Sequence, residues 1–426
     1  MKKEKLWIIL FLFFSSIMCV AIFLVSGNTY SVAVESQNGV WDLREMDFDA
    51  YNVSLTGEVE YIPYALLSPE EFAESDNIIV GKIPNVPYLT SRVRLIVPEN
   101  QHFNMAGYAD DFGSNIFVNG VLLTSVGRPA DNAEDNIPSE RFIRFTAFSK
   151  DGEIEIIQQT SNFVFRSNTS HKNWIIGNQE SVWRWVLTYT YVFIFNAGFF
   201  IALFFVHLLL FIILPRNKAN LWFSLLCLAL FIRTGIIFIR PMVVMLRLPW
   251  AFSLRTEYIT MLCGLVLMTL ACNIIFPGVL NKKFAHALYA ISGAFLLVFI
   301  FASTYFASQT ILHYHLLSCA WAAYVVIRIF ISKPDFKQRI IFTGFIVVFI
   351  ALVLDFLFYY MEPVLHSSVT EIAILILLMF QLTAMLLGTI EDAATLREAE
   401  HKLALENASL DRLNRLKTNM IATISH

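Results

Sequence analysis

The side chain with the clearest chemical potential is His426, the last residue of the sequence. It closes the stretch KTNMIATISH (417–426), in which Met420, Ile421 and Ile424 follow helical spacing. That spacing gathers the apolar side chains on one face of a helix and leaves His426 on the opposite face. An exposed imidazole that a neighbouring carboxylate orients and deprotonates is a nucleophile for a phosphoryl group. The spacing therefore permits an exposed His426 that could act as such a nucleophile; the alternative is a histidine without a catalytic role.

Four further ionisable residues lie inside long apolar runs, namely Arg233, Glu257, Asp355 and Glu371. A charge inside a membrane span is costly and is usually paired with another polar group. In a topology of seven spans that starts outside and ends in the cytoplasm, all four lie toward the outer side of the membrane. We therefore predict an intramembrane charge cluster in which Arg233 pairs with one or more of the carboxylates. The alternative, above all for Glu257 and Glu371, is that each side chain reaches water separately near a helix end.

The cysteines and the other histidines do not predict a metal site or a disulfide. All five cysteines lie inside apolar runs and are interpreted as small apolar side chains of membrane helices. His313 and His315 flank Tyr314 at an expected helix start, and side chains two positions apart on a helix point in different directions. His207 is expected to be a packed core residue. The cysteines are Cys19, Cys227, Cys263, Cys272 and Cys319.

Composition places much of this 426-residue chain in a membrane. Hydrophobic residues make up 57% of it, whereas soluble globular proteins have about 45–50%. The net charge of −3 offers no argument for a nucleic-acid partner. The N-terminal MKKEK precedes an apolar run from Leu6 to Val25, so residues 1–27 are predicted to be a signal peptide or an uncleaved signal anchor. Either one places residue 28 outside the cytoplasm.

Residues 28–183 have the pattern of an extracytoplasmic all-β sandwich. Residues 92–98 and 152–159 alternate apolar and polar side chains, as a half-buried strand does. Asn119-Gly120 interrupts a third alternating run and predicts a hairpin, because both turn residues need positive φ. The expected helix in this domain is 68–74, with Ser as N-cap and Pro at the first helical position.

Seven apolar runs follow within residues 184–391, each long enough to cross a hydrocarbon core of about 30 Å. Lys and Arg are concentrated in three alternate loops, and the positive-inside rule makes those loops cytoplasmic. The bundle then starts outside and ends inside, in agreement with the export signal. The predicted helices cover 186–213, 219–239, 256–278, 285–306, 311–332, 338–360 and 367–390. The loop cations are Arg216, Lys218, Lys282, Lys283, Lys333, Lys337 and Arg339.

Residues 392–416 predict a coiled-coil signalling helix that continues the last span. Apolar side chains recur with heptad spacing, although Glu406 and Lys417 fall on core positions. A dimeric helix is the preferred interpretation, and a short amphipathic surface helix is the alternative. The heptad residues are Leu396, Leu403, Leu410, Leu413 and Met420.

The terminal stretch resembles the start of the phosphoacceptor box of bacterial sensor histidine kinases, so 417–426 would begin the dimerisation and phosphoacceptor domain. In that family the phosphorylated His follows a short pattern, which consists of an apolar or aromatic residue, Ala, a small polar residue, an apolar residue and Ser. These places are taken by Met420, Ala422, Thr423, Ile424, Ser425 and His426. Met420 stands where Phe is common, and Thr423 stands where Asn is common. The family continues with Glu, a small apolar residue, Arg, Thr and Pro.

The rest of the chain resembles the seven-transmembrane receptors with diverse intracellular signalling modules. In the polar domain several short segments follow the order of a galactose-binding-like jelly roll, and two segments of the membrane half are similar as well. These segments are GVWDL (39–43), YALLSPEEF (64–72), SVGRP (125–129), SNFVFR (161–166), WIIGNQESV (174–182), RTEYI (255–259) and NIIFPGVLNKKF (273–284).

The jelly-roll resemblance implies an extracellular ligand, such as a carbohydrate or another small molecule. Aromatic and polar residues that suit such a ligand are Trp41, Tyr108, Arg128 and Trp174. A buried Trp is more often part of a core, so none of the four is singled out.

Together these features predict the sensor of a two-component system in a bacterial plasma membrane, with the N-terminal domain outside and the C-terminus in the cytoplasm. The resemblance implies a homodimer in which His426 is autophosphorylated with ATP and Mg²⁺ and passes the phosphoryl group to a response regulator. The ATP-binding domain is expected beyond this sequence, so the chain alone would be inactive. The alternative is a receptor of the same class with another output, such as a cyclic-dinucleotide enzyme or a non-enzymatic module.

Two other seven-helix classes are disfavoured. A retinal protein needs a lysine in the seventh span, and 367–390 holds none. A transporter is expected to have helix breakers in paired positions, and no such pairing appears.

Overall fold

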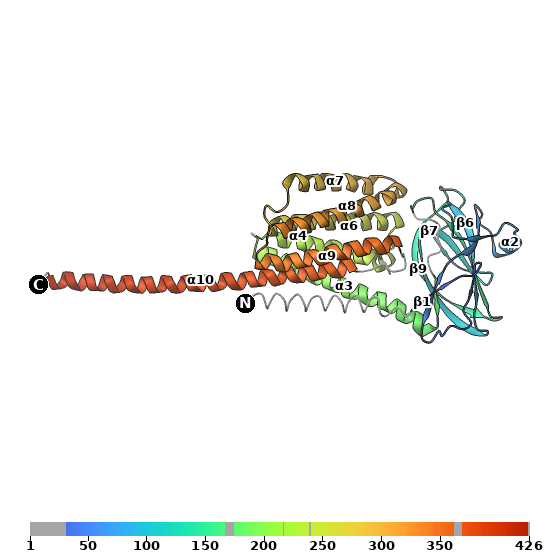
Figure 1. The fold of residues 1–426 in the computed structure, drawn as a ribbon, viewed down its shortest axis with the longest axis horizontal. Helices are drawn as coiled ribbons and strands as arrows, with labels where there is room; N and C mark the ends of the chain where they lie inside the picture. The colour runs from blue at the N-terminus through green and yellow to red at the C-terminus, as the bar shows by residue number, and fades with distance from the viewer. Residues whose placement is uncertain (1–30, 167–173, 216, 238–239, 362–368, 425–426) are drawn as a thin grey trace.

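A computed structural model of the chain describes residues 31–166, 174–215, 217–237, 240–361 and 369–424. Figure 1 shows a β-rich domain at one end, a bundle of long helices beside it, and one helix that extends far beyond the opposite end of the bundle. This layout confirms the predicted fold class. The predicted signal segment (1–27) and the phosphoacceptor His426 lie outside the described residues.

The β-rich domain is a sandwich whose two sheets share the long strand β7. One sheet has the order β1-β3-β11-β7-β9, and the other has the order β5-β4-β6-β10-β7-β8 with β2 beside β6. The strands are β1 (Ser31–Glu35), β2 (Val40–Asp42), β3 (Asn52–Thr56), β4 (Val59–Pro63), β5 (Ile79–Gly81), β6 (Tyr88–Ile96), β7 (Gln101–Val118), β8 (Val121–Val126), β9 (Ser139–Ser149), β10 (Glu153–Ser161) and β11 (Ile175–Gly177).

Local sequence explains the turns and the one short helix, α2 (Pro69–Ala73), of this sandwich. Asn119 and Gly120 have φ of 49° and 79° and form the predicted hairpin turn between β7 and β8. Ser68 caps α2, and its backbone N–H donates to the Glu71 carboxylate while the Ser68 side chain accepts from the Glu71 N–H. The core between the sheets is continuous and includes the fully buried Leu95.

The bundle contains seven helices that are long and apolar enough to cross a membrane, among the described residues. They are α3 (Gln179–Ile213), α4 (Ala219–Ile236), α6 (Trp250–Ile275), α7 (Lys282–Phe301), α8 (Thr304–Ile331), α9 (Phe336–Met361) and α10 (Val369–Ile424). A short helix, α5 (Pro241–Leu246), lies between α4 and α6. The first part of α10 is the seventh span, and the same helix continues without interruption through the predicted coiled-coil segment.

Several helix boundaries differ from the sequence-based prediction, among them the start of α3 at Gln179 instead of 186 and the end of α7 at Phe301 instead of 306. Helix α4 ends at Ile236 rather than at residue 239, and Arg240 takes a left-handed conformation before Pro241, which disfavours the helical conformation of the preceding residue. Helix α6 begins directly after Pro249, six residues earlier than predicted. Helix α8 begins at Thr304 instead of 311, because the Ser303 side chain accepts from the N–H of Phe306. His313 and His315 therefore lie within α8 and not at its start.

Candidate functional site

The sandwich passes directly into the membrane bundle, because β11 and α3 are separated by a single residue, Asn178. Its side-chain oxygen accepts from the Ser181 N–H at 2.7 Å and caps α3, while its amide donates to Asp49 Oδ1 at 2.7 Å. The buried Asn52 amide donates to the Ser181 carbonyl at 2.9 Å. A Cβ on Gly177 would lie 2.4 Å from Ser181 Oγ, so the junction requires glycine there. These bonds hold the first turn of α3 to the sandwich.

The next turn of α3 also packs on the sandwich. Trp185 and Val182 are buried with Ile175 of β11 in one apolar cluster. The Trp185 ring stacks on Phe142 of β9 at a centroid separation of 6.1 Å. Buried aromatic pairs of this kind contribute strongly to packing energy. Helix α3 and the sandwich are therefore expected to move as one body.

A second contact between the sandwich and the bundle is formed by the segment after β10. Asn162 Oδ1 accepts from the N–H groups of Val164 and Phe165 and so holds a tight turn. The turn places Phe165 in an apolar cluster with residues of α6, α7 and α8, where it is 9% exposed. The Arg166 N–H donates to Ser308 Oγ of α8 at 3.0 Å. Phe165 therefore anchors the sandwich to the helices on the side away from α3.

Inside the bundle, Arg233 of α4 and Glu257 of α6 approach each other. Arg233 Nη1 donates to the Glu257 carbonyl at 3.0 Å, and Arg233 Nη2 lies 3.9 Å from Glu257 Oε1. The two side chains are about one-fifth and one-quarter exposed, 21% and 27%. The pair therefore joins two helices at one end of the membrane domain.

The other two predicted carboxylates lie where α9 ends and α10 begins. Asp355 Oδ2 accepts from the Thr370 N–H at 2.9 Å, so α9 contributes a capping group to the first turn of α10. Glu371 is 6% exposed, and its Oε2 accepts from the Asn196 amide of α3 at 3.0 Å. Its second oxygen, Oε1, has no hydrogen-bond partner among the described residues.

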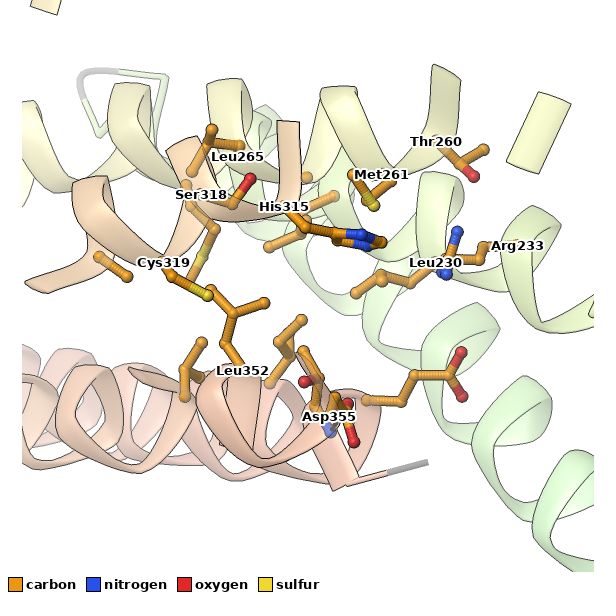
Figure 2. A pocket seen from close by; sticks show the side chains of 18 of the residues that line it. Leu230, Arg233, Thr260, Met261, Leu265, His315, Ser318, Cys319, Leu352 and Asp355 are labelled. Atoms are coloured by element: carbon orange, nitrogen blue, oxygen red, sulfur yellow. Dashed lines mark hydrogen bonds between the residues drawn. The ribbon is translucent and has the colours of Figure 1, made fainter. Parts of the chain in front are cut away.

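All four charged residues predicted from the sequence line one cavity of about 320 Å³ between α4, α6, α8, α9 and α10, which we call the bundle cavity. Figure 2 shows Arg233, His315 and Asp355, from three different helices, around one end of it. The other end is lined mainly by apolar residues such as Leu265, together with Cys319. The structure thus gathers charges that are separated by up to 138 positions (371 − 233) along the sequence.

A second buried polar group lies deeper in the bundle and was not singled out from the sequence. Asn220 of α4 has its Oδ1 3.4 Å from His207 Nδ1 of α3, and the same oxygen accepts from the Gln381 amide of α10 at 3.4 Å. All three side chains are buried. His207 and Gln381 are isolated polar residues in apolar runs, which is the sequence signal for a polar contact between membrane helices, whereas Asn220 follows a polar loop. Helix α10 is thus hydrogen-bonded to α3 through Glu371 and, further along, to α4 through Gln381.

The sandwich residues considered for ligand binding have different environments. Trp41 and Trp174 are buried in the core, where the Trp41 indole donates to the carbonyls of Val34 and Thr56. Tyr108 lies in β7, and its side chain is outside the described part. Arg128 is exposed at a loop, where it bonds Asp135. The two tryptophans therefore serve packing.

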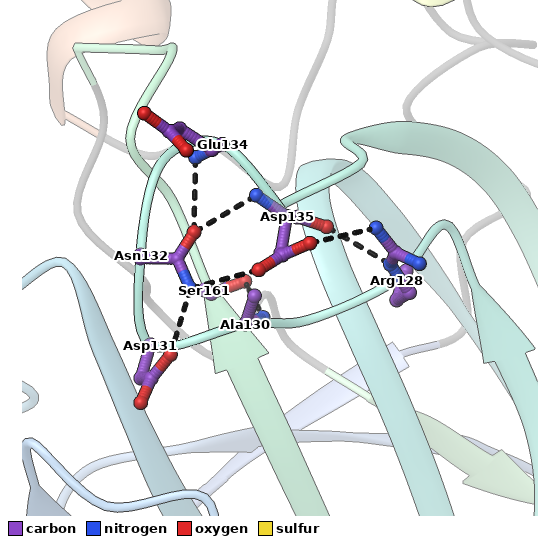
Figure 3. A network of polar contacts seen from close by, with 7 residues as sticks. All are labelled: Arg128, Ala130, Asp131, Asn132, Glu134, Asp135 and Ser161. Carbon is purple, nitrogen blue, oxygen red and sulfur yellow. Dashed lines mark hydrogen bonds and ion pairs between the residues drawn. The ribbon is translucent and has the colours of Figure 1, made fainter.

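The loop that contains Arg128 is organised by its own polar side chains (Figure 3). Asn132 Oδ1 accepts from the N–H groups of Glu134 and Asp135, and its amide donates to the Asp131 and Asp135 carboxylates. The Ala130 N–H donates to Ser161 Oγ at the end of β10. The Asn132 bonds hold the loop in a tight turn, and the Ala130–Ser161 bond ties the loop to β10.

The extended part of α10 carries the predicted heptad leucines on its surface, and the side chain of Met420 lies outside the described part. Leu396, Leu403, Leu410 and Leu413 are each more than half exposed in the single chain.

Among the described residues, no group of three His, Cys, Asp or Glu side chains is arranged to hold a metal ion.

Comparison with known proteins identifies the membrane domain. Residues 189–389 match the family model described as 7TM diverse intracellular signalling. This match and the N-terminal all-β domain indicate a seven-transmembrane signalling receptor, a multi-pass membrane protein. Neither the curated proteins nor the solved structures contain a significant match.

Proposed function

We propose that this receptor is the sensory part of a histidine kinase, in which a signal outside the cell controls phosphorylation of His426. The observation that carries the proposal is the continuity of α10, which runs as one helix of 56 residues from Val369 to Ile424. Glu371 in its first turn is bonded to α3, and its last residue lies two positions before His426. A displacement of the first turns of α10 could therefore be carried along one helix as far as Ile424, two positions before His426.

The route from the sandwich to this helix is made of the contacts described above. A ligand that reorients the sandwich moves α3 through the Asn178 junction and displaces α6, α7 and α8 through Phe165. Helix α3 transmits its shift to α10 through Asn196 and Glu371. Packed helices respond to such shifts by sliding or rotating as units.

The proposed orientation of the protein in the membrane rests on the basic loop before α9 and on the position of α10. Lys337 at the start of α9 forms an ion pair with Glu391 at 2.9 Å, so the basic loop before α9 adjoins the point where α10 leaves the bundle. Figure 1 places the sandwich at the other end of the bundle. The positive-inside rule then supports a cytoplasmic extension and an extracytoplasmic sandwich, and the resemblance to bacterial sensor kinases supports a bacterial plasma membrane.

The exposed leucines of α10 support a homodimer, in which His426 would be the output. The exposed heptad leucines of α10 need a partner helix, and a second copy supplies the same seam. The reaction forms a bond between an imidazole nitrogen and the γ-phosphorus of ATP, with ADP leaving, and an aspartate of a response regulator then receives the phosphoryl group. The ATP and its Mg²⁺ belong to a catalytic domain that the resemblance places after His426, so no described residue is assigned to them.

The alternative is a receptor of the same class that drives a cyclic-dinucleotide enzyme or a non-enzymatic module. The gene segment that encodes the residues after His426 separates the two. Glu, a small apolar residue, Arg, Thr and Pro at positions 427–431, followed by an ATP-binding domain, support the kinase. A different continuation, together with no phosphoryl transfer to His426 in the full-length protein, supports the alternative.

A further inference from the structure

The bundle cavity has the construction of a ligand site, with an apolar body and a charged end. Its apolar part is lined by adaptable and aromatic side chains, among them Met261, Met268, Trp321 and Phe345. A volume of about 320 Å³ is at the lower limit of small-molecule pockets, so a ligand of roughly ten non-hydrogen atoms is appropriate. The pocket lies within the membrane domain and is separate from the sandwich.

The charged end carries three carboxyl groups and two guanidinium groups. Glu257, Asp355 and Glu371 line it together with two guanidinium groups, those of Arg233 and Arg240, and with His315. Arg233 is already engaged by the carbonyl and the carboxylate of Glu257. The excess of carboxyl over guanidinium groups at this end of the cavity therefore favours a cationic ligand.

Glu371 identifies the position that such a cation would occupy. It is 94% buried (100 − 6), it lines the cavity, and its Oε1 has no hydrogen-bond partner among the described residues. A buried carboxylate oxygen without a donor is costly. A ligand ammonium group would supply the missing donor and a balancing charge at the same time.

We propose that the bundle cavity binds a small organic amine, whose ammonium group bonds Glu371 and whose apolar body lies between α4, α6, α8 and α9. The occupied site joins the start of α10 to four other helices, so the amine also biases the position of the output helix. This site is independent of the output that α10 drives, and it can be tested whether or not His426 is a phosphoacceptor.

Phenethylamine is a suitable probe, with 2-phenylethanol as its neutral analogue and 3-phenylpropionate as its anionic analogue. Binding of each labelled compound is measured on the full chain in nanodiscs of phosphatidylcholine and phosphatidylglycerol. We expect saturable binding that is tightest for the amine and weakest for the anion. Absence of saturable amine binding, or tighter binding of the anion, would overturn the proposal.

Two variants locate the site. Glu371→Gln removes the charge with little change of volume and is expected to weaken amine binding at least about tenfold, with 2-phenylethanol changed less than about twofold. Gly264→Leu is expected to abolish binding of both compounds, because Gly264 lines the cavity and a Cβ there meets only Leu226, at 4.0 Å. Leucine is also the better helix former, so this variant should fold. Unchanged amine binding in Gly264→Leu refutes the proposal even if Glu371→Gln fails to fold.

The source of the amine is distinguished by lipid composition. Phosphatidylethanolamine carries the same ammonium chemistry as a free amine. If nanodiscs that contain it compete with phenethylamine in the unmodified chain but not in Gly264→Leu, the lipid headgroup is the occupant. If they do not compete, the occupant is a free amine.

Discussion

The Asn196 amide donates a hydrogen bond to Glu371 Oε2 at 3.0 Å, and this bond is a buried polar link between α3 and α10. Helix α3 begins on the sandwich, and α10 ends beside the predicted phosphoacceptor. In the proposed mechanism, the Asn196–Glu371 bond is one of the contacts through which α3 would shift α10.

Replacing Asn196 with Ala should destabilise the bundle and change the resting output. The substitution leaves the buried Glu371 carboxylate without its donor, at a cost of about 2 kcal/mol. Thermal unfolding in detergent measures the loss, and basal phosphorylation of the full-length protein measures the output. Asn273→Ala is a matched control, because Asn273 makes an equivalent bond to Tyr289 between α6 and α7. Equal output changes in both variants would contradict a specific role for Asn196.

Replacing Phe165 with Ala should separate the sandwich from α6, α7 and α8 while both parts stay folded. Truncation of a buried phenylalanine typically costs about 3 kcal/mol, and here that cost falls on the contact between the two parts. Hydrogen exchange should rise around Ser308 and in the segment after β10. Phe163→Ala is the control, because Phe163 lies in the same segment but contacts Tyr88 of the sandwich. Protection of Ser308 as in the unmodified chain would refute the anchoring role of Phe165.

Replacing Gly177 with Ala should disturb the junction between β11 and α3. The added Cβ would approach Ser181 Oγ to 2.4 Å and Asn52 Oδ1 to 2.6 Å, so the buried Asn52–Ser181 bond has to lengthen or break. We expect a loss of about 1–3 kcal/mol in the free energy of unfolding. Gly198→Ala, in α3, has open space around its Cβ and should be neutral or slightly stabilising. Identical unfolding curves for the two variants would contradict this assignment.

Replacing Leu403 with Lys should weaken the predicted dimer. Leu403 lies on the heptad seam and is 60% exposed in the single chain, so a lysine there would place two charges in a dimer core. Sedimentation in detergent should show at least about a tenfold increase in the dissociation constant. Leu405→Lys is the control, because Leu405 is equally exposed, at 59%, but lies off the seam. Equal effects of both substitutions would point to a surface helix instead of a coiled coil.

Local patterns were sufficient to predict most of the architecture. The Asn119-Gly120 hairpin and the Ser68 cap depend on residues close together in the chain, and both are found where predicted. The seven spans follow from apolar length alone. The errors concern boundaries at which a specific side chain intervenes, such as Ser303 at the start of α8.

The contacts that join distant segments were only partly predictable. The four intramembrane charges were recognised because a charge in an apolar run is costly, and all of them line the bundle cavity. Neither the Glu371 bond to Asn196 nor the insertion of Phe165 between α6, α7 and α8 was predicted. Both depend on which helix faces come together, and one sequence does not reveal that.

The most direct test of the central claim is phosphoryl labelling of the full-length protein in nanodiscs with γ-labelled ATP. The label should resist alkali and be lost in acid, as expected of phosphohistidine, and it should vanish in His426→Gln. His401→Gln, on the exposed surface of the same helix, is the matched control and should keep the label. Persistent labelling of His426→Gln would contradict the assignment of His426 as the phosphoacceptor.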